Sequence, residues 1–563
     1  MSYIIVPSIE TFFRLPTANQ ERIFKGAHSV FDKNQLEGVI DTFYAAAALA
    51  VRNIKPSFNV RQFHDLETRP TIAVIADGAT IHTNILTPKQ HEIQKADGEK
   101  AVELGRNLAE RGWRVVLPGY TGLCENIMEG IREAGGQYIV VMNKRSLKYD
   151  DSGKPILPQN GDHGFYIITN TLAESKSVLF ALSDSLVYFK GGLRTLDIFT
   201  DHFVLQQISM LDSYRINGDH KRKLVLMNDD GFWQPVLNMT NHMIAEGFVD
   251  KEHREIARNT TSLSETLAEL DGTLRPGGLW PGPERGVPEL FIPSMAITLA
   301  AELSRASVMR QIRPTTAEGL KSALAEAKTC CAHGNSLIDP CIQNVISREI
   351  VRVYCGSRPR GDVVNKHTEA GYAAGYMIAE SDRGLVYGGA TKGIMGKVGD
   401  GSLAAKNSRH SPLILAVTPF SILLGTGTAV NEGFHPGLAV TIAAPGMQER
   451  KMFMSSLVGQ PQPPIEFRPK SVLLSGGWGS VDETIEDLVL GAQGVVDNEL
   501  IVCSIDGYWD CLPKTFEPGV SGGYTDPRGL DRISYVTSES ELEQKLARPQ
   551  GGSFVSVRAL NVA

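Results

Sequence analysis

The residues with the clearest chemical potential form a glycine-rich turn followed by a glutamate. The run Ser475–Ser480 (SGGWGS) follows an apolar stretch and precedes a helical pattern that contains Glu483. A strand that turns through glycines into a helix aims backbone N–H groups at an anion, most often a phosphate. A carboxylate beside such a turn predicts chemistry on a phosphorylated sugar rather than binding alone. The alternative is that Glu483 is an ordinary acid near a helix N-terminus, where the helix dipole favours it.

Two upstream segments accompany this turn. The run Tyr387–Gly396 (YGGATKGIMG) is again a strand end, a glycine turn and a helix start, and Arg450 and Lys451 open an apolar helical stretch. With Val353–Ser357 at the end of an earlier strand, these segments in this order resemble the LOG family, often labelled "lysine decarboxylase". The resemblance covers roughly residues 350–515. Members of that family hydrolyse the N-glycosidic bond of nucleoside 5'-monophosphates to a free base and ribose 5-phosphate.

The resemblance implies that Arg450 and Glu483 are the catalytic residues. Glycosidic cleavage passes through an oxocarbenium-like sugar cation, and a carboxylate can stabilise that charge or activate water. The planar guanidinium of Arg450 would orient the sugar or phosphate, although a plain surface arginine is the alternative. The implied substrate-binding residues are Gly388, Gly389, Gly393, Lys451, Gly476, Gly477, Gly479 and Ser480. Plain turn glycines and a structural lysine are the alternatives at these positions, and neither a cofactor nor a metal is expected.

The last motif departs from the family pattern. Ser475 replaces the family's proline, Ser480 replaces its threonine, and a proline-rich insertion of ten residues, Gly459–Arg468, precedes it. These departures leave open a non-catalytic nucleotide or cofactor sensor or carrier of the same Rossmann-like superfamily, or a scaffold in which one half regulates the other. Retention of both Arg450 and Glu483 favours the enzyme, because a binding protein has no need of the pair.

The N-terminal half repeats the same order of segments. Asp97 is the expected N-cap of a helix that precedes Trp113–Leu123, which matches the first glycine turn, and Leu186–Ile198 matches the last. An Asp-Gly-aromatic-aromatic segment then follows in both halves, at Asp230–Trp233 and Asp506–Trp509. The chain is therefore predicted to be a tandem duplication of one α/β unit.

The N-terminal copy lacks the chemical groups. Ser175 stands for the arginine, Ile198 for the glutamate, and Arg194 for the third glycine of the phosphate loop. An arginine there either blocks the loop or supplies a new anion contact. This copy is therefore predicted to be non-hydrolytic, with a structural or regulatory role.

The pattern of apolar runs predicts the fold class. Runs such as Pro412–Val417 and Glu499–Cys503 alternate with amphipathic helices, which indicates parallel sheets covered on both faces. We expect an α/β protein of two Rossmann-like, doubly wound parallel-sheet units in tandem, with ligands at the carboxyl ends of strands. The expected division is an N-terminal extension (1–70), a degenerate LOG-like domain (71–255), a linker with helices (256–345) and a LOG-like catalytic domain (346–563). Because the family resemblance implies homodimers, the two copies are expected to form an intramolecular pseudo-dimer, with further homo-oligomerisation open.

Composition and charge argue against several classes of protein. The chain has 563 residues and 56 basic against 63 acidic side chains, a net charge of −7 that argues against a nucleic-acid surface. The longest apolar run, Phe43–Val51, is far too short to span a bilayer, and the N-terminus lacks the pattern of a signal peptide. The seven cysteines do not form a disulfide framework, and Cys330, Cys331 and Cys341 fit free thiols better than a zinc site. A cytoplasmic protein without membrane or nucleic-acid partners is expected.

Overall fold

The computed structural model describes most of the two repeated halves. Its described residues are 3–5, 70–77, 86–147, 164–169, 183–208, 223–271, 349–357, 364–405, 412–419, 440–444 and 469–547, with isolated positions in 172–180, 435 and 447–458. Most of the predicted extension, the linker residues 272–345 with their cysteines, and the insertion Gly459–Arg468 lie outside these residues. The chain divides into two compact units. Unit 1 comprises Met1–Asn241, Lys251–Thr298 and Cys511–Pro527, and unit 2 comprises His242–Asp250, Leu299–Asp510 and Arg528–Ala563.

Unit 1 is built on an eight-stranded sheet in which all strand pairs are parallel. In spatial order the strands are β1 (Tyr3–Ile5), β5 (Gly164–Thr169), β4 (Tyr138–Asn143), β3 (Arg114–Leu117), β2 (Thr71–Ile75), β6 (Ser185–Tyr188), β7 (Leu224–Met227) and β8 (Ala257–Thr260). The described residues of β2, β3, β4, β6 and β7 are all buried. Continuous burial is what a sheet covered on both faces requires.

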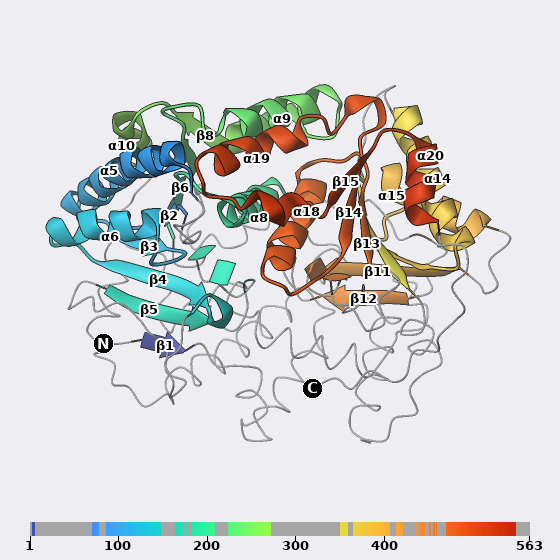
Figure 1. Ribbon diagram of the computed structural model, residues 1–563, viewed down its shortest axis with the longest axis horizontal. Coiled ribbons are helices and arrows are strands. Elements are labelled where there is room, and N and C mark those ends of the chain that lie inside the picture. The colour runs from blue at the N-terminus through green and yellow to red at the C-terminus, as the bar shows by residue number, and fades with distance from the viewer. Residues whose placement is uncertain are drawn as a thin grey trace, which may run out of the picture. The chain divides into compact units, whose positions relative to one another are not determined.

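Unit 2 repeats this arrangement in a seven-stranded sheet, again parallel throughout (Figure 1). The spatial order is β12 (Val440–Ala444), β11 (Leu413–Pro419), β10 (Gly384–Tyr387), β9 (Ile350–Tyr354), β13 (Lys470–Leu473), β14 (Glu499–Cys503) and β15 (Ile533–Val536). Apart from β1, the order of the two sheets is the same. In each unit the strand order reverses beside the first strand of the repeat, at β2/β6 and at β9/β13, and such a switch point is where α/β folds bind ligands.

Helices cover both faces of each sheet, which confirms the predicted α/β, doubly wound class. Among the described residues, unit 1 contains α5 (Pro88–Glu110), α6 (Leu123–Glu133), α8 (Leu193–Gln207), α10 (Leu263–Asp271) and α19 (Leu512–Ser521). It also contains the first part of α9 (Gln234–Ala245), whose residues from His242 onward belong to unit 2. Unit 2 further contains α14 (Val364–Glu380), α15 (Gly393–Ala404), α18 (Trp478–Ala492) and α20 (Glu539–Leu546). Short 3₁₀ turns lie at Lys144–Ser146, Lys251–Ile256, Ile505–Gly507 and Pro527–Leu530. In unit 2, α14, α15 and α20 pack on one face, while α18 contributes the other.

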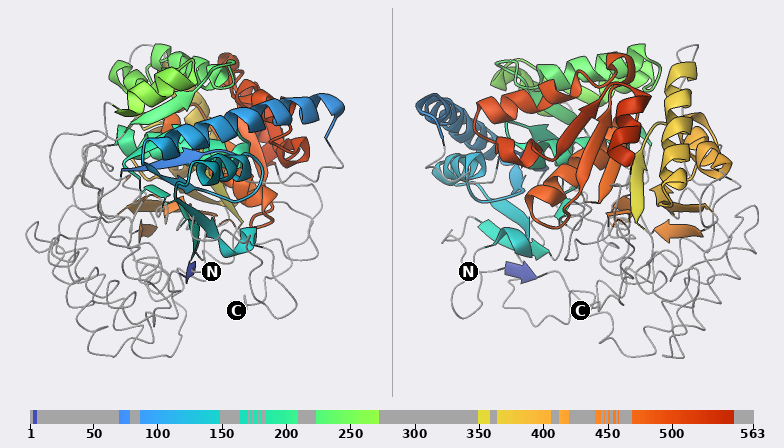
Figure 2. Two further views of the ribbon diagram at one scale, coloured as in Figure 1. Left: turned by 90° about the vertical axis from the view of Figure 1, so that its left-hand side faces the viewer. Right: turned by 45° about the vertical axis from the view of Figure 1, so that its right-hand side comes forward.

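The first two helices of each repeat pack against each other, and Figure 2 shows the pair of unit 2, α14 and α15, side by side. A Cβ atom at Gly375 would lie 1.9 Å from the carbonyl oxygen of Val398, and one at Gly105 in unit 1 would lie 2.2 Å from that of Ile127. Only glycine allows this approach of helix backbones. The same device in both units, together with the shared strand order, supports the tandem duplication.

One helix boundary differs from expectation. Helix α5 begins at Pro88 and is capped by Thr87, whose side chain accepts a hydrogen bond from the Gln90 N–H in a capping box. Asp97 therefore lies inside the helix and is not its N-cap. Thr87 followed three residues later by Gln90 is the sequence pattern of a capping box, and this pattern indicates the observed start of the helix.

Each unit also contains a segment from the other half of the sequence. Unit 1 includes Cys511–Pro527, where Tyr524 contacts Phe232, and unit 2 includes His242–Asp250, where Phe248 contacts Tyr508. The four-part division predicted from the sequence stays a prediction, as does the pseudo-dimer, but neither unit is one uninterrupted stretch of chain.

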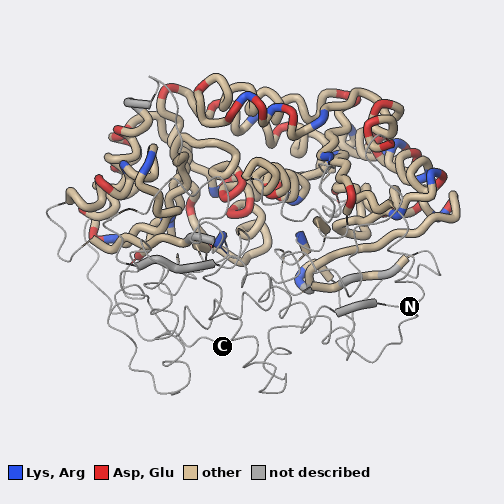
Figure 3. The backbone as a smooth tube through the Cα atoms, turned by 180° about the vertical axis from the view of Figure 1, so that it is seen from behind, with Lys and Arg blue, Asp and Glu red and all other residues tan. Residues whose placement is uncertain are grey.

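The described residues contain no helix long and apolar enough to cross a membrane. Acidic and basic residues alternate along the described backbone in Figure 3, without a long stretch of one sign. This distribution fits the mixed charge of the sequence.

Candidate functional site

Three turns of unit 2 meet at the carboxyl ends of β9, β10 and β13. Gly356, just after β9, donates its N–H to the carbonyl oxygen of Ser475 at 3.0 Å. Its own carbonyl oxygen accepts from the N–H groups of Ile394 and Met395 at the start of α15, at 3.1 and 3.3 Å. Gly356 thus links all three turns, a role that the sequence did not reveal.

The phosphate loop predicted after β13 has the close approaches that its glycines suggested. A Cβ atom at Gly476 would lie 2.9 Å from the N atom of Gly356 and 2.2 Å from Oγ of Ser480, so a larger residue does not fit. Gly477 is the N-cap of α18. At Gly479 the corresponding space is open, with no atom within 4 Å. The loop is therefore crowded at its first glycine and open at its third.

The glycine turn after β10 forms an adjacent wall. Gly389 and Gly393 have φ angles of 82° and 61°, a left-handed conformation that side chains disfavour. A Cβ atom at Gly388 would lie 3.1 Å from Nη2 of Arg450. The structure therefore brings the predicted Gly388 and Arg450 together.

Arg450 and Glu483 form a buried ion pair, in which Nη1 of the arginine donates to Oε1 of the glutamate. Nε of Arg450 donates to the Val417 carbonyl oxygen at the end of β11, at 2.9 Å. Glu483 lies in the second turn of α18, which begins at Trp478. Because the helix dipole acts mainly on the first turn, the dipole does not account for the position of this carboxylate.

The charges of Glu483 and Arg450 affect the pKa of the nearby Cys355 thiol. Burial, followed by the negative charge of Glu483, raises the pKa of this thiol well above its usual value. A thiol in this state stays protonated and is a poor nucleophile. Cys355 is therefore a poor candidate for a nucleophile at this site.

Lys451 is held inside the fold. Its Nζ lies 3.0 Å from Oδ2 of Asp482 and 2.7 Å from Oε2 of Glu486, and all three side chains are buried. Unit 1 has the same arrangement, in which Lys176 contacts Asp197 at 3.0 Å and also Asp201. Since the triad persists in the copy without the Arg450–Glu483 pair, the geometry favours a structural role for Lys451 over substrate contact.

Unit 1 has hydroxyl and apolar groups where unit 2 has its ion pair. The Oγ of Ser175 lies 2.6 Å from Oγ1 of Thr169, which donates to the Met142 carbonyl oxygen at 3.3 Å. Ile198, at the position of Glu483, is buried. Neither position supplies a charge to a sugar or a water molecule.

Unit 1 also differs at two glycines of the proposed phosphate site. Asp77 donates its N–H to the Lys190 carbonyl oxygen at 2.8 Å, the bond that Gly356 makes in unit 2, so Asp77 stands in that glycine's place. Arg194 stands in the place of Gly479. Burial lowers the pKa of Arg194, and its Nη1 makes a 3.4 Å hydrogen bond to Ser146. A carboxylate at one position and a bulky side chain at the other disfavour a phosphate in unit 1.

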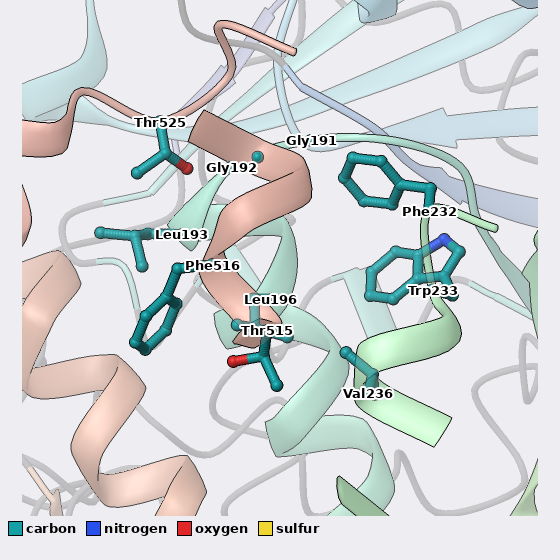
Figure 4. A pocket seen from close by; sticks show the side chains of 11 residues that line it. Gly191, Gly192, Leu193, Leu196, Phe232, Trp233, Val236, Thr515, Phe516 and Thr525 are labelled. Carbon is teal, nitrogen blue, oxygen red and sulfur yellow. The ribbon is translucent and has the colours of Figure 1, made fainter. Parts of the chain in front are cut away.

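A pocket lies beside the glycine loop of unit 1 (Figure 4). It is lined by Gly191, Gly192, Leu193, Leu196, Phe232, Trp233, Val236, Thr515, Phe516, Gly519 and Thr525. Leu193 and Gly519 correspond in the repeat to Trp478 and Met243, which are fully buried in unit 2. The pocket thus results from two smaller side chains. Its volume of about 20 Å³ has room for one water molecule and none for a nucleotide.

Three side chains that are absent from the predicted site surround the phosphate loop of unit 2. His367 Nδ1 lies 2.9 Å from Ser475 Oγ, and the Tyr508 hydroxyl donates to the Gly476 carbonyl oxygen at 2.6 Å. Phe248 contacts both rings. The recurring Asp-Gly-aromatic-aromatic motif was the available signal for Tyr508, whereas His367 has no motif around it.

Comparisons with known proteins agree with the family resemblance. A family model described as "Possible lysine decarboxylase" matches residues 124–270, which lie in the N-terminal copy. The chain is 26% identical over 174 residues to the cytokinin riboside 5'-monophosphate phosphoribohydrolase LOG of Oryza sativa subsp. japonica, covering 31% of this chain and 65% of that protein. It is 27% identical over 184 residues to the cytokinin riboside 5'-monophosphate phosphoribohydrolase of Rhodococcoides fascians, covering 32% of this chain and 81% of that protein.

A solved structure, the molybdenum cofactor binding protein from Rippkaea orientalis, is 18% identical and aligns with a TM-score of 0.25, covering 36% of this chain and 96% of that one. A likeness this low bears on neither mechanism nor ligand. The sequence matches confirm the similarity to the LOG family, and the equal strand order of the two sheets makes the tandem duplication plausible.

Proposed function

We propose that unit 2 hydrolyses the N-glycosidic bond of a nucleoside 5'-monophosphate, giving a free base and ribose 5-phosphate. The observation that carries this proposal is the buried Arg450–Glu483 pair beside an open glycine loop at the carboxyl edge of a parallel sheet. Unit 1 repeats the fold and lacks this pair, which supports a structural or regulatory role for unit 1. The phosphoribohydrolase activity named for the sequence relatives agrees with this chemistry.

The glycine loop would hold the 5'-phosphate. Backbone N–H groups at the start of α18 carry partial positive charge, and the space at Gly479 is open. Ser480 adds a hydroxyl donor. The base would then lie toward the turn that contains Gly388, Gly389 and Gly393.

Glu483 would act at the anomeric carbon. As the bond from C1' to the base nitrogen breaks with its electron pair leaving on the base, positive charge develops on the ribose, and the carboxylate stabilises it. Water adds to C1' and passes one of its protons to Glu483, and the transfer of that proton to the departing base returns Glu483 to the carboxylate form. The hydrogen bond from Arg450 orients the carboxylate for this task.

Arg450 has a donor left for the substrate. Nε is used by Val417 and Nη1 by Glu483, while Nη2 makes no hydrogen bond among the described residues and faces Gly388. The rigid fork of a guanidinium allows one arginine to orient the carboxylate and a ribose or phosphate oxygen together. Loss of Arg450 is therefore expected to affect binding and turnover alike.

The proposal is tested by incubating the purified full chain with a panel of nucleoside 5'-monophosphates and detecting free base by chromatography. The matching nucleosides without phosphate are the control for the role of the loop. We expect base release from at least one monophosphate and little from its nucleoside. Binding of several nucleotides without cleavage of any would instead make the protein a nucleotide sensor or carrier.

A further inference from the structure

We propose that His367 is a positioning residue for the phosphate loop of unit 2 and acts through Ser475. What the loop binds rests on the function proposed above, but the positioning itself does not. His367 belongs to α14, far from the loop in sequence, and its side chain is buried. Its Nδ1 lies 2.9 Å from Ser475 Oγ, the first residue of the loop.

The His367 ring is fixed by its neighbours. It packs edge-to-face on Phe248 and Tyr508, with ring centroids 5.6 and 5.3 Å away. Aromatic pairs at such distances favour one orientation. Nδ1 is therefore aimed at Ser475 by packing as well as by the hydrogen bond, and Glu246 lies 3.9 Å from Nε2 on the other side of the ring.

A second bond holds the next loop residue. The Tyr508 hydroxyl donates to the Gly476 carbonyl oxygen at 2.6 Å. Two consecutive residues, Ser475 and Gly476, are thus each held by a buried side chain. Holding the loop before a ligand arrives reduces the entropy lost on binding, so a fixed loop binds an anion more tightly than a mobile one.

Unit 1 shows that this contact position is a general feature of the repeat. Lys190 stands in the place of Ser475 and Asp97 in the place of His367, and they form an ion pair at 2.6 Å. The helix after the first strand therefore holds the loop after β6 in unit 1 and after β13 in unit 2. Only the chemistry differs, an ion pair in unit 1 and a hydrogen bond in unit 2.

Variants of His367 separate this role from simple packing. In His367→Asn the amide lies near the position of Nδ1 and can keep the bond to Ser475, whereas in His367→Gln it extends toward Nε2. Ser475→Ala removes the bond without touching the buried ring, and it remains informative if a histidine variant fails to fold. Ser475→Pro restricts the backbone of the loop without any side-chain hydrogen bond. It is therefore expected to restore the rigidity of the loop in the His367→Gln background.

The first measurement is amide hydrogen exchange of residues 475–480 in the full chain, with urea unfolding as the check on the fold. We expect faster loop exchange in His367→Gln and Ser475→Ala, near wild-type exchange in His367→Asn, and recovery in the His367→Gln, Ser475→Pro double variant. Unchanged exchange in both His367→Gln and Ser475→Ala would overturn the proposal. So would equal loosening by Asn and Gln, because that result indicates lost packing.

The second measurement is the Kd for ribose 5-phosphate. Loss of one hydrogen bond of positioning is expected to weaken binding up to about tenfold in His367→Gln and Ser475→Ala, with little change in His367→Asn. If the loop loosens as expected while the wild type binds neither ribose 5-phosphate nor any nucleotide, the proposed function fails and the positioning role stands. If the loop loosens and ribose 5-phosphate binds equally to all variants, the positioning role is overturned for this ligand.

Discussion

Units 1 and 2 hold the same buried lysine between two acids, and they differ at the residue next to it. Lys176 and Lys451 occupy equivalent positions, each neutralised by two carboxylates of the following glycine-loop helix. The preceding residue is Ser175 in one unit and Arg450 in the other. Both copies have therefore kept the charges that hold this lysine against the glycine-loop helix, and only one copy has the charges that face the proposed substrate.

A second comparison shows that geometry is kept even where charge is not. In unit 1 Lys223 pairs with Glu269 at 2.8 Å, and in unit 2 Glu499 pairs with Lys545 at 2.7 Å. These residues stand at matching places in the two repeats, with the signs reversed. The two charges of a solvent-exposed ion pair can be exchanged with little loss of stability. The carboxylate proposed to act on the sugar cannot be exchanged in this way, because its negative charge takes part in the reaction.

The largest expected effect comes from Glu483→Gln, which keeps shape and hydrogen bonding but removes the charge. Turnover of the best nucleotide should fall by ~10²–10⁴-fold, the range for a positioned acid–base group, with a smaller change in Kd. Steady-state kinetics and calorimetry give the two quantities. Ile198→Val, at the equivalent place in unit 1, is the control and should leave turnover unchanged; wild-type turnover in Glu483→Gln would disprove the mechanism.

Arg450→Ala should lower the free energy of unfolding by about 3–5 kcal/mol, because it leaves the buried Glu483 without its partner. Turnover and nucleotide affinity should both fall as well. The matched variant Ser175→Ala loses only a hydroxyl contact and should cost about 1 kcal/mol. Urea unfolding measures both values, and equal losses would show that the two positions do not differ as described.

Lys451→Met and Lys176→Met should destabilise the protein by similar amounts, about 3 kcal/mol each, because each removes a buried cation that contacts two buried carboxylates. Turnover per folded molecule should change little in either variant. The measurement combines thermal unfolding with activity corrected for the folded fraction. If Lys451→Met folds normally but loses nucleotide affinity, the lysine contacts substrate as the family resemblance first implied.

The smallest effect is expected from reversing the Glu499–Lys545 pair to copy the signs found in unit 1. Because Lys470 also lies 3.3 Å from Glu499, the reversal is made in a Lys470→Met background, where the double variant Glu499→Lys, Lys545→Glu should differ from its parent by less than about 1 kcal/mol at neutral pH. A larger loss would show that the sign matters at this place.

The same pair predicts a pH dependence. Partial burial opposes ionisation of Glu499, but hydrogen bonds from Lys545 and Ser534 and the charge of Lys470 lower its pKa from 4.5 to about 2. A lowered pKa means that its stabilising effect is complete above about pH 4.5 and is lost as the pH falls toward 2. Glu499→Gln should therefore flatten the acid limb of stability in urea titrations; an unchanged acid limb would argue against this pairing.

The parts of the fold that sequence reasoning could predict are those with local signals. Apolar runs, glycine turns and the repeat of motifs were enough for the two parallel sheets and for the convergence of the three turns of unit 2. The motif order predicts Arg450 and Glu483 at one site, with a ribose between them, but it does not predict their direct ion pair. These features depend on residues close to one another in sequence or on the rule that parallel strands share an edge.

What could not be predicted depends on contacts between distant segments. The bond between His367 and Ser475 joins residues 108 positions apart, and neither residue type is unusual where it stands. The presence of His242–Asp250 in unit 2 and of Cys511–Pro527 in unit 1 leaves no trace in local composition. The ion pair of Asp97 with Lys190 likewise joins distant elements, whereas the true start of α5 had a local signal in Thr87 and Gln90.

Titration calorimetry on the Glu483→Gln protein shows whether only one of the two copies binds a nucleotide, as proposed for unit 2. We expect one nucleoside 5'-monophosphate per chain. Gly479→Arg, which copies the arginine of unit 1 into an open space, should abolish this binding, and Arg194→Gly should leave it intact. Two nucleotides per chain, or binding that survives Gly479→Arg and is lost in Arg194→Gly, would contradict the assignment of the site to unit 2.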